Sequence, residues 1–258
     1  MKKAEKPRIV SAVLGFILGS AVLQGCFDVV FEQPQPGSFK NLSGFPEPVY
    51  GKYIFIPRMD STQNSTTHEM TIENNQVVYT VNESEKVLLS EKDKIARLES
   101  YKNSRKENPT RVKTFSHTIK GDTFYFFKSE KTYYTIGREF LLRRMDNNYF
   151  LNIPDTIYEM NKKVVGYDVL LLSFRTSDTL VLSIPSFEVT PKNKDTVYSE
   201  NEDPKSQKIK ACCTIAPFHQ WKQPEGGDLY TADPDSTQLR ELIKKGLFIE
   251  FGVYHKLK

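Results

Sequence analysis

The chain has 258 residues, with 36 lysines and arginines against 32 aspartates and glutamates, and a formal net charge of +4. Residues 1–25 carry four of the basic residues and one acidic residue, so the remainder holds 32 basic and 31 acidic residues, a net charge of +1. A near-neutral chain lacks the basic surface that binds nucleic acid or anionic lipid headgroups. The composition therefore argues against a nucleic-acid-binding protein and against electrostatic attachment to a membrane.

The N-terminus has the layout of a secretory signal. Four basic residues come first: Lys2, Lys3, Lys6 and Arg8. The apolar stretch Ile9–Leu23 follows with 15 residues. This length suits a signal peptide and falls short of the ~20 residues that a membrane-spanning helix needs. A buried N-terminal helix or an uncleaved anchor is the alternative interpretation.

The apolar stretch ends in Leu23-Gln24-Gly25-Cys26, which resembles the lipobox of bacterial lipoproteins. The resemblance implies cleavage before Cys26 and acylation of that residue, with diacylglycerol on the thiol and palmitate as a typical further chain. Two or more acyl chains hold a protein stably at a membrane. We therefore expect a lipid-anchored protein of the bacterial cell envelope. In lipoproteins of Bacteroidota, which this chain resembles, a run of acidic residues after the cysteine tends to mark surface export. Only Asp28 follows Cys26 closely, so the resemblance implies a periplasm-facing position over the cell surface.

Residues 26–50 are predicted to be the lipidated cysteine and a proline-containing tether. Four prolines punctuate the segment: Pro34, Pro36, Pro46 and Pro48. Proline removes backbone donors and favours extended chain. Three phenylalanines are too apolar for a free linker: Phe31, Phe39 and Phe45. Part of the tether is therefore expected to dock on the folded domain.

Residues 51–258 are predicted to form a single β-rich globular domain. Short runs of β-branched and aromatic residues recur, with hairpin turns expected at Asn74-Asn75 and at Lys120-Gly121-Asp122. The predicted fold is α+β and β-dominated, an antiparallel sheet meander (sandwich or open barrel) with one or two peripheral helices. In the long strand candidate Val164–Arg175, the leucines at 170–172 indicate burial on both faces.

Two segments have helical patterns. Within Ser84–Lys106, Ile95 and Leu98 are spaced for one helical face. Asp235–Lys245 is the clearer helix, because it starts at a capping residue and is followed by glycine. The polar residues 190–208 are interpreted as a solvated loop.

The adjacent Cys212 and Cys213 are interpreted as reduced cysteines in a strand. A strained vicinal disulfide is the alternative. No second cysteine pair or neighbouring histidine pair accompanies them, so no metal site and no cofactor is expected.

An Asp-Ser/Thr-apolar unit recurs along the chain. Ordinary β chemistry explains it, since aspartate ends turns and threonine begins strands. The unit also resembles the sequon for O-glycosylation of secreted proteins in Bacteroidota. The resemblance makes Ser61 and Thr196, which lie in polar surroundings, candidate O-glycosylation sites.

Catalytic motifs are not found. The four histidines are far apart in the sequence, and no G-x-S-x-G or S-x-x-K motif occurs. No catalytic residue is therefore assigned. Aromatic residues offer the remaining candidates: Tyr125, Tyr134 and Trp221, if exposed, could stack on sugars or on a protein partner. The alternative is that they form cross-strand pairs inside a sheet.

These observations favour a membrane-anchored envelope lipoprotein with a non-catalytic binding or scaffolding domain. Its expected partner is an envelope protein or a glycan, with no nucleic acid. A secreted hydrolase acting on glycan or peptide is the alternative. The short start after Cys26 and the recurring Asp-Thr units resemble envelope lipoproteins of Bacteroidota, and the resemblance identifies no functional family.

Overall fold

The computed structural model describes residues 29–55, 64–100, 110–159, 162–188, 203–222 and 228–257. The chain divides into two compact units, each described by itself below. Unit 1 comprises the residues up to Ser43 together with Glu139–Phe174 and Val181–Gly252. Unit 2 comprises Gly44–Arg138, Arg175–Leu180 and Val253–Lys258. The sequence predicted one domain from residue 51 with a tether before it; in the structure, residues 29–43 of that tether belong to unit 1.

Unit 1 contains strands from distant parts of the chain and two helices. Its elements are β1 (Val29–Phe31), β7 (Leu141–Met145), β8 (Asn148–Glu159), α3 (Pro204–Cys213), β11 (Phe218–Lys222), β12 (Asp228–Ala232) and α4 (Ser236–Lys244). Most of β9 (Lys162–Thr176) and parts of β10 (Thr179–Pro185) and β13 (Phe248–Lys256) also belong to it. The strands follow the order β11-β12-β1-β9-β10. Outside this order, β8 pairs with both β7 and β9.

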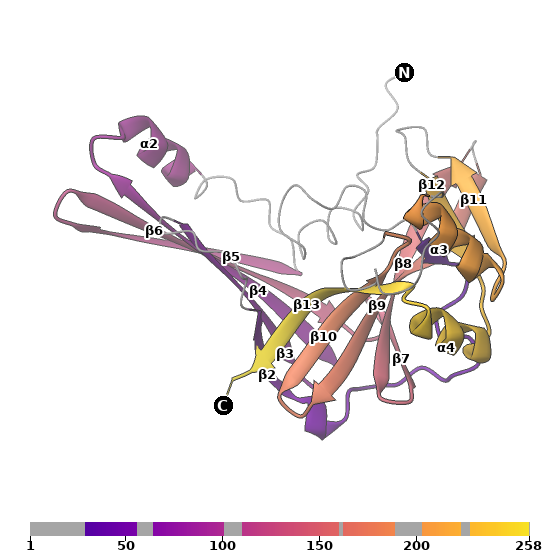
Figure 1. Cartoon of the computed structure of the whole chain (residues 1–258). Coiled ribbons are helices and arrows are strands. Elements are labelled where there is room, and N and C mark those ends of the chain that lie inside the picture. The colour runs from indigo at the N-terminus through magenta and orange to yellow at the C-terminus, as the bar shows by residue number, and fades with distance from the viewer. Residues whose placement is uncertain are drawn as a thin grey trace, which may run out of the picture. The chain divides into compact units, whose positions relative to one another are not determined.

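The core of unit 1 lies between these strands and the two helices. In this core Phe31 stacks on Phe248 and Phe150 meets Phe248 edge to face, with ring centroids 6.3 Å apart in both pairs. α3 and α4 both pack against this core, through Cys212 and through Leu239 and Leu242 (Figure 1). Burial of these side chains is the main stabilising term of the unit.

Unit 2 is a sheet with a helix over one end. Its elements are the 3₁₀ turn η1 (Glu47–Val49), β2 (Gly51–Phe55), β3 (Asn64–Ile72), β4 (Gln76–Leu88), α2 (Lys92–Ser100), β5 (Arg111–Lys120) and β6 (Thr123–Thr135). The strand order is β13-β2-β3-β4-β6-β5. α2 covers the ends of the long strands β4 and β6 (Figure 1). Its Ile95 and Leu98 contact a small cluster around Val87, Phe124 and Phe126.

The fold class predicted from the sequence is confirmed: the protein is β-dominated α+β. The strands form one mixed sheet that is not closed into a barrel. β1 pairs in parallel with β12 and antiparallel with β9, and this parallel pair makes the sheet mixed. The hairpin turns at Asn74-Asn75 and at Gly121 lie where predicted, and Gly121 takes the positive φ of 61° that favours glycine.

The helices confirm two predictions and correct one. α2 and α4 occur where the apolar spacing indicated, and Asp235 caps α4 as expected. α3 was missed, because it begins inside the segment interpreted as a loop and has few apolar residues. Cys212 and Cys213 therefore lie at the end of a helix and not in a strand, and both are free thiols. In the parts of the chain that the structure describes, no helix is both long and apolar enough to span a membrane.

The described part of the predicted tether is built into the fold. Val29, Val30 and Phe31 are at most 2% exposed, and β1 is an inner strand of unit 1. The Arg143 guanidinium donates hydrogen bonds to the carbonyl oxygens of Pro34, Pro36 and Gly37. The docking expected for Phe31, Phe39 and Phe45 is observed, since the first and third are buried and Phe39 packs on the unit 1 core.

Candidate functional site

One face of the unit 2 sheet carries a row of small polar side chains. Successive residues of a strand point to opposite faces, whereas directly paired residues share a face. The register pairs Ser84 with Phe127 and Phe127 with Ser116. Two residues away on each strand, the register pairs Thr67 with Asn82, Asn82 with Ser129 and Ser129 with Thr114. These seven side chains therefore belong to one face, which we call the hydroxyl face.

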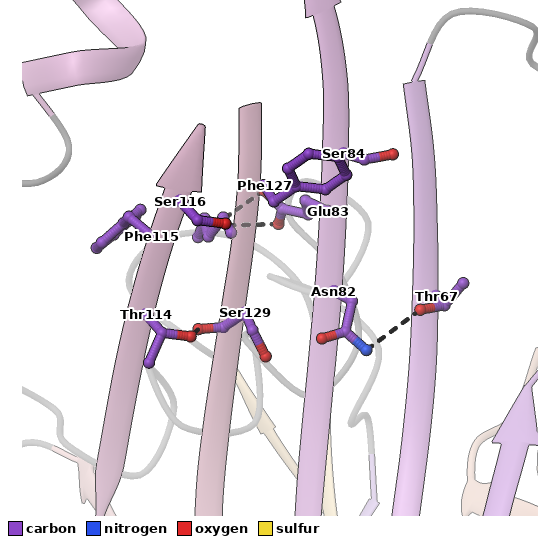
Figure 2. A pocket seen from close by; sticks show the side chains of 10 residues that line it. Thr67, Asn82, Glu83, Ser84, Thr114, Phe115, Ser116, Phe127 and Ser129 are labelled. Carbon is purple, nitrogen blue, oxygen red and sulfur yellow. Dashed lines mark hydrogen bonds and ion pairs between the residues drawn. The ribbon is translucent and has the colours of Figure 1, made fainter. Parts of the chain in front are cut away.

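A shallow groove of about 300 Å³ lies on the hydroxyl face. Figure 2 shows the Phe127 ring between Ser116 and Ser84, with Ser129 and Asn82 next to it along the strands. Four strands contribute lining residues, from β3 to β5. The groove thus combines one aromatic ring with hydroxyl and amide groups, each of which can donate and accept hydrogen bonds.

Phe127 is unusual because it is 44% exposed in a sheet whose other face buries Phe124 and Phe126. Tyr125 lies two residues away on β6, hence on the hydroxyl face, and is half-buried. The Lys86 ammonium lies 5.9 Å from the centre of the Tyr125 ring. The exposed phenyl surface is in unfavourable contact with water. A ligand stacked on the ring would remove that surface from water and so gain binding free energy.

The hydrogen bonds seen within the groove are weak. The Asn82 amide donates to the Thr67 hydroxyl over 3.4 Å, and the Thr114 hydroxyl donates to the Ser129 carbonyl over 3.4 Å (Figure 2). Both distances exceed the usual range for hydrogen bonds between such groups. A bound hydroxyl could replace either contact at little cost.

The two charged residues that line the groove neutralise each other. Glu83 and Lys128 also line it, but they alternate with the residues of the hydroxyl face and pair with one another. The Lys128 ammonium donates to both Glu83 carboxylate oxygens, over 3.1 and 3.0 Å. This neutral setting suits an uncharged ligand better than an anion or a cation.

The three aromatic candidates lie in different surroundings. Tyr134 is 7% exposed, which leaves little of its ring free to stack on a ligand. It belongs to β6, as Tyr125 does, and the odd separation of nine residues sets it on the face opposite Tyr125. Trp221 lies in unit 1, where its indole N–H donates to the Thr231 hydroxyl over 2.9 Å, and it is half-buried.

The remaining candidates concern modification. Cys26, Ser61 and Thr196 lie outside the described residues. Among the Asp-Ser/Thr units that are described, Thr123 and Thr179 begin strands, in line with the β chemistry expected of them, whereas Thr156 lies within β8 and Ser236 begins α4.

Ionisable groups form no metal-binding cluster in the described parts of the chain, where no three His, Cys, Asp or Glu side chains come together. In unit 2, His68 Nδ1 lies 2.6 Å from the Tyr79 hydroxyl, which is also hydrogen-bonded to Tyr254. Burial lowers the pKa of His68 and raises the pKa of Tyr254 to about 12. Burial likewise raises the pKa of Tyr79. The three side chains thus form a neutral hydrogen-bonded chain inside the sheet.

The sequence contains a signal for the groove, in the alternation of residues along two strands. In β5, Thr114, Ser116 and Thr118 alternate with larger residues, and in β4 Asn82 and Ser84 do the same. Such alternation marks a polar face of a strand. Comparison of the chain with protein-family models, with curated proteins and with solved structures gives no match.

Proposed function

We propose that the protein is a lipid-anchored component of the bacterial envelope that binds a neutral glycan chain in the groove around Phe127, without catalysing a reaction. The observation that carries the proposal is the half-exposed phenyl ring surrounded by hydroxyl and amide groups. The anchor rests on the lipobox resemblance at Cys26. Residues 1–25 would be removed on export.

A glycan fits this groove by its chemistry. A sugar ring presents a C–H face that can stack on an aromatic ring, and its edge carries hydroxyl groups that both donate and accept hydrogen bonds. Phe127 offers the ring, while Asn82, Ser116 and Ser129 offer partners for the hydroxyl groups. The paired charges of Glu83 and Lys128 favour a neutral sugar over an acidic one.

Binding is expected to be weak because the groove is shallow. A dissociation constant on the order of 0.1–1 mM corresponds to about 4–5.5 kcal/mol. Repetition along a polymer, or several protein copies on one membrane, would raise the effective affinity.

We favour binding over cleavage because the groove lining holds one carboxylate. Glycoside hydrolysis generally uses two carboxyl groups roughly 5–10 Å apart. Glu83 is the one carboxylate among the lining residues, and it already pairs with Lys128. Incubation of the same sugars with the protein, followed by chromatography, would reveal any hydrolysis.

The test is titration of the full-length protein in detergent with neutral and acidic oligosaccharides of about five sugars, followed by calorimetry or NMR. Phe127→Ala should weaken binding at least tenfold. Ile119→Ala is the matched control, since Ile119 is 55% exposed in the neighbouring strand β5 but lies on the opposite face. Equal binding by wild type and Phe127→Ala, or binding of acidic sugars alone, would contradict the proposal. Mass spectrometry of the membrane-extracted protein tests the lipid on Cys26 separately.

A further inference from the structure

The distance between Cys26 and the folded part of unit 1 is short. Val29, the first residue of β1, comes three positions after Cys26. Consecutive Cα atoms are 3.8 Å apart, so three steps span at most about 11 Å in any conformation. A lipid on Cys26 would therefore hold β1 within about that distance of the headgroup region.

β1 cannot readily be pulled out to lengthen this connection. Its three residues are buried, and β1 lies between β12 and β9 in the sheet. The backbone N–H of Glu32 donates to the Ala232 carbonyl over 3.0 Å. Releasing the strand would open the core around Phe31 and Phe248.

Trp221 lies close to the start of β1. The register places Val29 beside Tyr230, and Tyr230 beside Gln220, the residue before Trp221. Adjacent strands lie about 4.8 Å apart, so the backbone at Trp221 is roughly 10 Å from the start of β1. The indole is half-buried and oriented by its bond to Thr231, which is 2% exposed.

An indole in this state suits a lipid–water interface. Tryptophan is enriched at membrane interfaces, where its apolar ring meets the headgroup region. The bond to the Thr231 hydroxyl satisfies the one polar group of the side chain. The ring can therefore leave water without an unpaired donor.

We infer that unit 1 lies directly on the membrane and that Trp221, at the β11–β12 edge beside β1, contacts the lipid headgroup region. The inference rests on the lipidation of Cys26, which belongs to the proposed function, and it is independent of the glycan groove. It replaces the proline-containing tether expected from the sequence with direct contact between unit 1 and the bilayer.

Trp221 is the single tryptophan of the chain, so tryptophan fluorescence reports on this side chain alone. The full-length protein, purified from membranes, is reconstituted in phosphatidylcholine vesicles with or without lipids brominated at acyl positions 6,7 or 11,12. Emission should be quenched at least twofold by the 6,7 lipid and less by the 11,12 lipid. Insertion of ten glycine and serine residues after Phe27 should abolish the quenching while leaving the lipid in place.

The outcomes separate the two proposals. If mass spectrometry shows the lipid and Trp221 is not quenched, the membrane contact is refuted and the lipid anchor stands. If quenching persists with the inserted linker, the contact does not depend on the short connection, and the inference is again refuted. A protein without lipid on Cys26 overturns both the anchor and the inference, whereas the sugar titration still tests the groove.

Discussion

Asn152 is predicted to hold the N-terminal segment on unit 1, and Asn152→Ala should release it. The side chain has no exposed surface and forms two hydrogen bonds with the buried residue Gln35. The Gln35 N–H donates to Asn152 Oδ1 over 2.5 Å, and Asn152 Nδ2 donates to the Gln35 carbonyl over 2.8 Å. The same amide nitrogen also lies 3.3 Å from the Leu141 carbonyl and 3.2 Å from the Phe150 carbonyl.

The expected loss follows from those contacts. A buried N–H or C=O left without a partner costs about 1–3 kcal/mol. Asn152→Ala leaves both backbone groups of Gln35 in that state, so the free energy of unfolding of unit 1 should fall by about 2–6 kcal/mol. Urea unfolding at neutral pH measures this change. Hydrogen exchange of the Gln35 amide should accelerate as well, by about tenfold for each 1.4 kcal/mol of stability lost.

Asn147→Ala is the matched control, because Asn147 lies exposed in the turn between β7 and β8. Its substitution should change stability by no more than about 0.5 kcal/mol. If Asn152→Ala costs less than about 1 kcal/mol, the segment is not held by these bonds and the reasoning fails.

Three further predictions concern single groups. Asp235→Ala should lower stability by about 1 kcal/mol in urea unfolding, because Asp235 accepts hydrogen bonds from two backbone N–H groups at the start of α4; a change no larger than that of Ser236→Ala would contradict this. Burial lowers the pKa of His68 below its ordinary 6.5, so the unfolded chain binds the proton more readily and unit 2 should lose stability as the pH falls below 6.5. In the His68→Gln variant, the urea midpoint of unfolding should depend less on pH between 7.5 and 5.5. If the slope in that range is unchanged, other groups cause the loss of stability. In the Cys26→Ala protein, only the exposed thiol of Cys213 should react with iodoacetamide at pH 8. The thiol of Cys212 should not react, because burial raises its pKa to about 11. Rapid modification of two thiols would refute this.

Local patterns predicted the elements whose signals lie close together in the chain. The β3–β4 and β5–β6 hairpins follow from alternating residues around turn signals, and α4 follows from its cap and apolar stripe. α3 gave no such signal, because its burial depends mainly on Ile209 and Cys212 in an otherwise polar helix.

The β6 strand shows why the site was harder to predict. Its middle carries two charged residues, Lys128 and Glu130, which pair with Glu83 and Arg111 on the neighbouring strands. The groove forms only when four strands pair in the correct register, and the residue pattern within one strand does not determine that register. Only Tyr125 among the three aromatic candidates lies on the face with Phe127.

The parallel pairing of β1 with β12 also bears on the order in which the protein can fold. Val29 and Tyr230 are neighbours in the sheet but about two hundred residues apart in the chain. Contacts of such long range form late, because a large loop must close first. If the chain is exported from its N-terminus, β1 reaches the new compartment long before its partner does. The continuous part of unit 2, Gly44–Arg138, can fold in that interval. Unit 1, and the pairing of β13 with β2 in unit 2, are completed only when the last quarter of the chain arrives.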